Sequence, residues 1–550
     1  MTRLLSCILN DPRSGSYNQD TERLFAYHQG TKHTLHSVRS SAHFLDWKNQ
    51  PSPFRAYEGA LNIELPPDPG FPETGTFAAM AALAESASKV ASDKLESGES
   101  ILLDRIWLSR LLWHSMAVSS WKKVPQTGSR YSLRVNPSSG NLHPTETYVA
   151  LQSFEGLDDG LYHYRADCHA LELRSRGKWT QRLARDLNLA GSIEPSLIVG
   201  LTSIFWREAW KYRDRAYRYC CHDLGHAMMS MFLASQALGL PGGAIAHFGD
   251  VGLTRALGLV GSDEAPMVFL VFPSKKASKQ ISAPPEEAFA GTPNELSAEE
   301  VPYELLLGMH RATVLPDSAE ALIVAGGEPS GIDLPQKPDS DAPLKTVVRR
   351  RRSALDFDPQ TSPMPRVELE QILGFATMDW PADWRGNFPG QAGAHSTRND
   401  FVTLYLYIHR VSGCEPGVYR WERQSRTLAQ LHAGDVQRVA AYLSLEQSLA
   451  GNGCFTVSMI ADLASAARLF GNRGYRYVYF EAGAIGQRLY LGAETLNWNA
   501  TGIGAFYDDD VHRYLGFLDE GAKIDSSTLA QQVIYHFAVG RAIPDPRIEA

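Results

Sequence analysis

The chain has 550 residues, a length at which a single hydrophobic core has stopped growing, so two or more domains are expected. Hydrophobic residues make up 44% of it and charged residues 21%, which is the composition of a globular protein. The formal net charge of −8 argues against nucleic acid as an obligatory partner, although a local basic site for a phosphate remains allowed.

The N-terminal region and the cysteines set further limits. The first apolar run is too short for a signal peptide, and no stretch approaches the roughly 18 unbroken apolar residues of a membrane helix, so a cytoplasmic protein without a membrane partner is expected. None of the six cysteines forms a Cys-x-x-Cys pair or a zinc-spaced cluster with histidine, so no metal site is expected. Adjacent Cys220 and Cys221 are interpreted as small buried hydrophobes of a helix.

The composition along the chain divides it into four segments. Residues 1–100, rich in Pro, His and Tyr, are interpreted as an N-terminal extension of a first domain, with no counterpart before the second domain beyond linker. The first domain covers 101–275. Residues 276–345, rich in Pro, Ser, Glu and Ala, are interpreted as a linker in which VPYELLLGMHRATVL forms a short docked helix. A second domain covers 346–550.

Both domains show the same order of elements. In the first, an amphipathic helix at 103–116 precedes strands at 145–152 and 197–201, a long helix from about Arg213, a glycine-containing strand and a last strand at 267–272. In the second, the matching elements are a helix at 366–377, strands at 402–409 and 455–460, a long helix from about Arg473 and a last strand at 533–539. This order predicts the α+β class, a mostly antiparallel sheet flanked by helices.

An internal repeat supports this division. The stretch AYRYCCHDLGHAMMSMFLASQALGL, starting at Ala216, aligns with GYRYVYFEAGAIGQRLYLGAETLNW, starting at Gly474. A constant offset of 258 residues continues without a gap to Gly258 and Gly516, and GLYHY at 160 echoes GVYRW at 417. A period this long indicates a duplicated domain rather than a solenoid.

Two stretches are candidates for ligand binding. Residues 136–144, NPSSGNLHP, form either a plain turn or a loop that addresses a planar heterocycle through hydroxyls and backbone N–H groups. The run Arg349-Arg-Arg-Arg-Ser353 is either a solvated basic segment or a grip for a phosphate. Arg541, after the last strand, is either a surface arginine or a further phosphate partner.

Two other stretches are candidates for chemistry. Gly502-Ile-Gly-Ala-Phe506, like Gly243–Phe248 in the first copy, is either an ordinary strand start or a place where backbone approaches a ligand closely. Lys211 and Tyr212 are either part of a charged, aromatic helix face or a pair of proton-transfer groups. The second copy has Leu469 and Phe470 in their place. A purely structural role would not predict this replacement, although drift would.

The order of these motifs resembles that of the nitroreductase-like flavoproteins, and within them the SagB-type dehydrogenases, which include azoline oxidases of ribosomal peptides. The resemblance covers about 100–275 and 345–550. The matching residues are Pro137-Ser138-Ser139-Gly140-Asn141, Trp206, Lys211-Tyr212, Tyr217-Arg218-Tyr219, Arg351-Arg352-Ser353 and Gly502-Ile503-Gly504-Ala505-Phe506.

This resemblance implies FMN as the cofactor, bound across two domains that normally come from two subunits. The implied contacts are Pro137, Ser138, Ser139 and Asn141 from the first copy, and Arg351, Arg352, Ser353, Gly502, Gly504 and Arg541 from the second. The reciprocal site is degenerate by the same criteria. At the position of the Pro-Ser-Ser loop the second copy has the different segment Gly393–Asn399, and the first copy lacks an arginine run. We therefore predict an internal pseudo-dimer with one FMN. Leu355 stands where a basic residue is usual, so another donor must reach the flavin's pyrimidine edge.

The same resemblance implies that Lys211 and Tyr212 are catalytic, one as base and the other as its polariser. One of their pKa values must then be lowered by the site. The implied function is an FMN-dependent dehydrogenase or oxidase of a peptide-derived or small heterocyclic substrate. Two alternatives stay open: a nitro- or quinone reductase fed by NAD(P)H, and a non-catalytic flavin-binding docking subunit of a biosynthetic complex.

Overall fold

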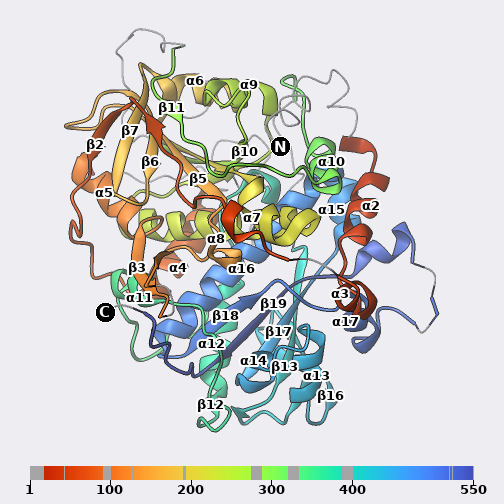
Figure 1. The fold of residues 1–550 in the computed structure, drawn as a ribbon. Coiled ribbons are helices and arrows are strands. Elements are labelled where there is room, and N and C mark those ends of the chain that lie inside the picture. Colours follow the sequence, from red (N-terminus) through yellow and green to blue (C-terminus); the bar gives the residue numbers. More distant parts are fainter. Residues whose placement is uncertain are drawn as a thin grey trace.

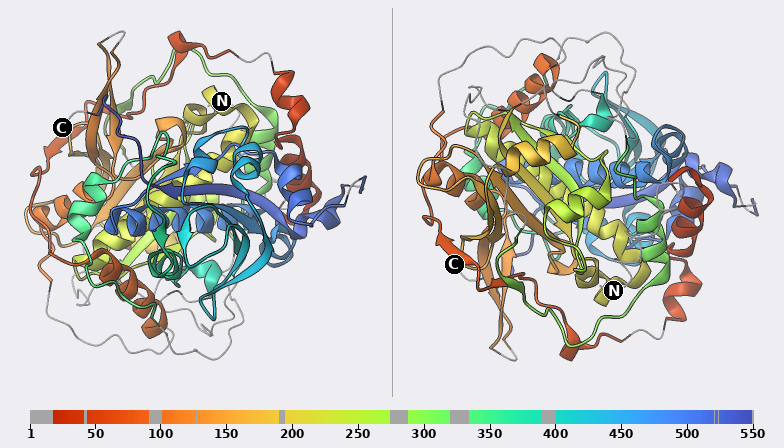
Figure 2. Two further views of the ribbon diagram at one scale, coloured as in Figure 1. Left: turned by 90° about the horizontal axis from the view of Figure 1, so that it is seen from below. Right: turned by 90° about the horizontal axis from the view of Figure 1, so that it is seen from above.

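The computed structural model describes residues 18–41, 44–90, 101–125, 128–189, 194–273, 288–319, 334–386, 388, 400–519, 521–522 and 524–548. Its main feature is two antiparallel sheets with two long helices between them (Figures 1 and 2). This is the predicted α+β class, and the predicted duplication is confirmed because each sheet belongs to one copy of the repeat.

The two sheets have the same topology. The first has the strand order β2-β7-β6-β5-β8-β10-β9 and the second the order β16-β15-β13-β17-β19-β18, which correspond strand for strand once β2 is set aside. The bounds are β2 (Leu61–Glu64), β5 (Thr145–Leu151), β6 (Gly160–Arg165), β7 (Ala170–Arg176), β8 (Pro195–Ser203), β9 (Gly243–Ile245), β10 (Ala265–Pro273), β13 (Val402–Ile408), β15 (Gly417–Glu422), β16 (Thr427–Ala433), β17 (Phe455–Ala461), β18 (Asn499–Ile503) and β19 (Gln532–Gly540). A separate hairpin consists of β3 (Val118–Lys123) and β4 (Arg130–Arg134).

Helices cover the sheets and join the two copies. Their bounds are α2 (Glu22–Gly30), α3 (Leu35–Arg39), α4 (Thr76–Val90), α5 (Arg105–Trp113), α6 (Trp179–Asp186), α7 (Phe205–Tyr212), α8 (Ala216–Ala237), α9 (Asp250–Ala256), α10 (Glu304–Ala312), α11 (Leu344–Arg350), α12 (Arg366–Ala376), α13 (Gln437–Leu443), α14 (Leu449–Asn452), α15 (Leu463–Phe470), α16 (Gly474–Thr495) and α17 (Asp508–Tyr514). Within the described ranges, no helix has both the length and the apolar character needed to cross a membrane.

The helices α8 and α16 form the centre of the molecule (Figure 1) and are buried along almost their whole length, so apolar residues surround them instead of forming one stripe. They cross where glycine stands in both copies. A Cβ atom at Gly225 would lie 2.9 Å from the Cα of Gly483, and a Cβ at Gly483 would lie 2.9 Å from the Cα of Gly225. The two glycines are equivalent by the offset of 258. The crossing therefore lies on a pseudo-twofold axis, and its closeness requires glycine on both sides.

Buried ion pairs join the two copies on one side of this axis. Asp508, the first residue of α17, accepts hydrogen bonds from Arg215 and Arg218 of the first copy at 3.1 and 3.0 Å. Burial alone would raise the pKa of Asp508, but these two arginines bring it below its ordinary value. The carboxylate is therefore ionised at neutral pH, and removing one partner would leave a buried charge uncompensated.

The same arrangement recurs across the axis. Asp250, the first residue of α9, is bound by Arg473 at 2.6 Å and by Arg476 at 3.3 Å, and all three residues lie 258 positions from their counterparts. Because each carboxylate belongs to one copy and its arginines to the other, the two clusters hold the halves together in a defined orientation.

The duplication also includes a helix in front of each domain. Thr31, after α2, accepts a hydrogen bond from Arg218 at 2.7 Å, and Thr313, after α10, accepts one from Arg476 at 2.8 Å. The two threonines are 282 residues apart, more than 258, because the segments that follow differ in length. The docked helix predicted between the domains is thus present as α10. The N-terminal segment thus has its counterpart within the predicted linker, and only the environment of the two threonines reveals their equivalence.

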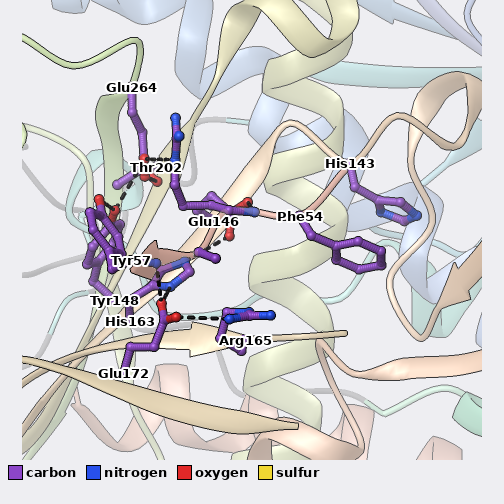
Figure 3. Close-up of polar contacts among 12 residues, drawn as sticks. Phe54, Tyr57, His143, Glu146, Tyr148, His163, Arg165, Glu172, Thr202 and Glu264 are labelled. Carbon is purple, nitrogen blue, oxygen red and sulfur yellow. Dashed lines mark hydrogen bonds and ion pairs between the residues drawn. The ribbon is translucent and has the colours of Figure 1, made fainter. Parts of the chain in front are cut away.

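The N-terminal segment is attached to the first sheet through a buried polar network (Figure 3). His163 lies between Glu146 at 3.1 Å and Glu172 at 2.9 Å, and these carboxylates raise the pKa of His163 against the effect of burial. Glu172 also accepts the backbone N–H of Tyr57 at 3.0 Å, and the Tyr57 hydroxyl hydrogen-bonds that of Tyr148. Together with the pairing of β2 and β7, these contacts hold the N-terminal segment on the first sheet. The same segment leads to the cavity described below.

Candidate functional site

A cavity of about 1220 Å³ lies between the two copies. It exceeds the roughly 300–1,000 Å³ of an ordinary small-molecule pocket, so it can accommodate a cofactor and a second molecule. All but two of the predicted site residues line it: Pro137, Ser138, Ser139, Asn141, Tyr212, Arg351, Arg352, Ser353, Gly502 and Gly504. Residues from both copies thus meet in one site, as the resemblance implied.

The loop at 136–144 is a constrained structure at one wall of this cavity. Gly140, Asn141 and His143 have φ angles of 59°, 60° and 50°, a region that side chains other than asparagine rarely adopt. Asp223 of α8 holds the loop by accepting hydrogen bonds from the backbone N–H and the hydroxyl of Ser139, both at 3.0 Å. Backbone strain held in place by a buried carboxyl favours the functional interpretation of this loop over a plain turn.

The predicted catalytic pair lies at the end of α7, directly against the loop. A Cβ atom at Gly140 would lie 2.7 Å from the Tyr212 hydroxyl and 3.2 Å from Lys211 Nζ, so both polar groups reach the loop. Burial, with the nearby Glu208 as the next cause, raises the pKa of Tyr212 well above its ordinary value. The phenol is therefore protonated at neutral pH and can donate a hydrogen bond, so Tyr212 is not the member of the pair whose pKa the site lowers.

Two arginines supply positive charge that lacks a carboxylate partner within the described residues. Arg351 is only 4% exposed, donates to the carbonyl oxygens of Val135 and Arg134, and leaves its Nη1 without a protein acceptor there. Arg352 donates to backbone carbonyls, including that of Arg349 at 2.8 Å, and its Nε likewise has no protein acceptor. Burial lowers both pKa values, that of Arg352 to about 10. Buried guanidinium groups in this state fit an anion such as a phosphate.

The glycine strand meets the cavity beside these arginines. The Tyr490 hydroxyl accepts the backbone N–H of Gly502 at 2.8 Å and hydrogen-bonds the Ser353 hydroxyl at 2.8 Å, which links the strand to the arginine run. A side chain at Gly502 would collide with Tyr535, and one at Gly504 would collide with the Tyr219 ring. The structure therefore explains these glycines first by close aromatic packing, which the sequence did not indicate.

Arg541 and Lys211 are the two predicted residues outside the cavity lining. Lys211 reaches the lining through its contact with the loop. Arg541 does not, because it follows the end of β19, stacks over the Trp498 ring at 4.3 Å and donates to the carbonyl of Asn497. The structure thus does not bring Arg541 to the other predicted phosphate contacts.

Several lining residues were not predicted from the sequence, among them Asp223, His226, Tyr490 and Tyr535. A usable signal existed for Asp223, since it and its counterpart Glu481 are acids at equivalent positions of the two repeated helices. Leu355 also lines the cavity and is 53% exposed, so it supplies no polar donor.

The reciprocal interface is filled by the chain itself. The Trp384 ring stacks on Tyr477 with centroids 5.1 Å apart and planes 13° apart, and Tyr477 is the counterpart of Tyr219. The neighbouring carboxylate of Asp383 accepts the backbone N–H groups of Ala246 and His247 at 3.2 and 2.9 Å. Ala246 is the counterpart of Gly504, so an indole and a carboxylate occupy the position that corresponds to the cavity.

Trp380 completes this filling. It is 1% exposed and packs against Trp384 at 5.4 Å and against Phe232, the counterpart of Tyr490, at 6.1 Å. The predicted degenerate loop at Gly393–Asn399 lies outside the described residues. The packing of the segment from Trp380 to Arg385 therefore explains why one interface is open and the other is closed.

Comparison with known proteins identifies relatives of both halves. The model of the family described as "Nitroreductase family" matches residues 108–272 and 348–541. A protein of Methanocaldococcus jannaschii named as a nitroreductase is 30% identical over 181 residues, which are 33% of this chain and 88% of that protein. The trifolitoxin operon protein TfxC of Rhizobium leguminosarum bv. trifolii is 32% identical over 130 residues, 23% of this chain and 36% of TfxC.

A solved structure matches almost the whole chain. The crystal structure of a protein from Anabaena variabilis, described as a nitroreductase, has a TM-score of 0.69 at 24% identity and covers 95% of this chain and 99% of that one. At this identity the match supports the tandem fold alone.

Proposed function

This chain belongs to the nitroreductase family and is an FMN-dependent oxidoreductase, and from that premise we propose a SagB-type dehydrogenase or oxidase that acts on a peptide-derived or small heterocyclic substrate. The observation that carries the proposal is the placement of Lys211 and Tyr212 against the Ser138–Asn141 loop, at a cavity too large for one small ligand.

The residues that would hold FMN are those on the second-copy wall of the cavity. Arg351, Arg352 and Ser353 would bind the phosphate, because the two buried guanidinium groups have unused donors toward an anion. FMN, when bound, supplies a two-electron acceptor. The loop at Ser138–Asn141 and the strand at Gly502–Gly504 would enclose the flavin from the two copies.

The proton chemistry falls to α7. Lys211 would accept the proton that leaves the substrate during dehydrogenation, and Tyr212, which stays protonated, would donate a hydrogen bond to a substrate heteroatom. The N-terminal segment and the β3–β4 hairpin add four aromatic side chains to the lining, Trp47, Phe54, Trp121 and Tyr131. Such a wall suits a planar heterocycle or an extended peptide that carries one. The relative named for a trifolitoxin operon supports a role in natural-product biosynthesis.

The first measurement is the visible spectrum of the purified protein, with flavin released, identified and counted. The second is incubation of the holoprotein with a synthetic azoline-containing peptide under air, followed by mass spectrometry for the loss of two hydrogens. Conversion that requires Lys211 supports the proposal. No conversion, combined with rapid bleaching of the flavin by NADPH and turnover of a quinone, favours the nitro- or quinone reductase. The names of the Methanocaldococcus and Anabaena relatives are the observation behind this second candidate.

A further inference from the structure

A pair of buried acids lies directly behind the loop and the catalytic pair. Glu208 of α7 is fully buried, and its Oε1 lies 3.5 Å from the Ser138 hydroxyl. Asp223 of α8 is 2% exposed and accepts both hydrogen bonds from Ser139 described above. The two carboxyl groups are within hydrogen-bonding reach of each other, and the second oxygen of Glu208 has no other acceptor or donor partner among the described residues.

The surroundings of the pair do not neutralise two negative charges. The groups that face it are Lys211 and Tyr212 from α7, Tyr219 and Cys220 from α8, and Tyr535 from β19. Lys211 is the single basic side chain among these. The nearest arginines of α8 are instead bound to Asp508. Burial raises the pKa of Glu208 well above its ordinary value and that of Asp223 to about 7. Two carboxyls in contact in a dry site cannot both ionise readily.

We propose that Glu208 and Asp223 share a single proton, and that the resulting singly charged pair is a positioning device that fixes the Ser138–Ser139 turn against Lys211 and Tyr212. One acid must be ionised, because both carboxyl oxygens of Asp223 accept hydrogen bonds from Ser139, at 3.0 and 3.1 Å from its backbone nitrogen, and neither is free to act as a donor there. The other must be protonated, because otherwise the two carboxylates would repel each other across the junction of loop and helix. Glu208 lies one helical turn before Lys211, so repulsion there would displace the catalytic side chains. The link to catalysis depends on the proposed role of Lys211, but the shared proton does not.

The test is an infrared titration of the holoprotein between about pH 6 and 9, with FMN affinity followed over the same range by fluorescence quenching. We expect an absorption of one protonated, buried carboxylic acid at neutral pH that disappears in Glu208→Gln. In the wild type, FMN affinity should fall as the pair loses its proton. Glu208→Gln mimics the protonated acid, so it should keep neutral-pH affinity within about twofold and abolish this pH dependence.

A matched variant separates positioning from general stability. Asp223→Ala removes both anchors of Ser139 and should weaken FMN binding by on the order of tenfold. Glu22→Gln, an exposed glutamate of α2, should change neither affinity nor the titration. Absence of the protonated carboxylic acid signal at neutral pH would overturn the proposal, and so would a titration of FMN affinity that Glu208→Gln leaves unchanged. Both readouts are independent of the substrate, so they stand even if the proposed dehydrogenation fails.

Discussion

The two interfaces of this duplicated chain share their framework and differ in what fills them. Both have a tyrosine at the same position of the long helix, Tyr219 in one and Tyr477 in the other. Each faces the end of a short strand of the opposite copy, β18 for Tyr219 and β9 for Tyr477. At the first interface that strand carries Gly502 and Gly504 and borders the cavity. At the second, Trp384 stacks on the tyrosine and closes the space.

This difference shows how a symmetric fold supports an asymmetric site. The elements that hold the halves together, namely the glycine crossing and the two arginine–aspartate clusters, occur in both copies because both halves need them for stability. The arginine run and the Lys-Tyr pair occur once, since a single site needs each of them once. The segment Trp380–Arg385 replaces a ligand with side chains of the chain itself, which avoids an empty apolar cavity at the second interface.

The largest expected effect concerns the closed interface. Trp384→Ala should destabilise the holoprotein by about 3–5 kcal/mol, because a fully buried indole is lost, while FMN stays at one per chain. Denaturant unfolding and flavin counting measure the two quantities. Phe44→Ala, at an 88% exposed side chain, is the control and should have little effect. Two FMN per chain, in the wild type or the variant, would contradict the closed-interface interpretation.

Catalysis at the open interface gives the next effect. Lys211→Ala should lower the rate of flavin reduction by substrate at least about a hundredfold while FMN remains bound, because the base is removed. Leu469→Ala, at the equivalent position of the second copy, is the matched control and should be neutral, since this leucine is 55% exposed. Stopped-flow absorbance follows the flavin directly. Full activity of the Lys211 variant would refute its role.

Cofactor affinity distinguishes the arginines from one another. Arg351→Met should weaken FMN binding by about 1.5–3 kcal/mol, the usual contribution of a hydrogen bond to a charged group. Arg350→Met is the control, because that guanidinium binds Glu494 and lies outside the cavity lining. Fluorescence quenching gives both dissociation constants. Equal affinities for the two variants would remove Arg351 from the phosphate site.

The smallest expected effect is the acid sensitivity of the framework. The pKa of Asp508 is lower in the folded state than its unfolded value of about 3.9, so its stabilisation is present above that pH and is lost as the pH falls through the folded value. Unfolding measured between about pH 5 and 2 should show this loss, and Asp508→Asn should show less pH dependence in the same range. An unchanged pH profile in the variant would indicate that other carboxyls dominate acid unfolding.

Much of the site was predictable because its parts are short, local patterns. The loop at Pro137–Asn141, the arginine run and the glycine strand were each visible in the sequence, and their meeting in one cavity follows from the duplication. Asp223 and Glu208 were not predicted, because their function depends on contact with Ser138 and Ser139, about 70 to 84 positions away in the chain. Arg541 was misplaced for the converse reason, since its position after a strand does not reveal which way its side chain turns.

The sequence by itself determined the duplication, the α+β class and the register that relates the two copies, because hydrophobic periodicity and repeated residues are properties of neighbouring positions. The tertiary structure alone decided what closes the second interface. The closure depends on the packing of Trp380–Arg385 onto β9 of the other copy, with Asp383 bound to Ala246 across 137 positions. Contacts of this kind come from the packing of both halves at once, so no local pattern encodes them.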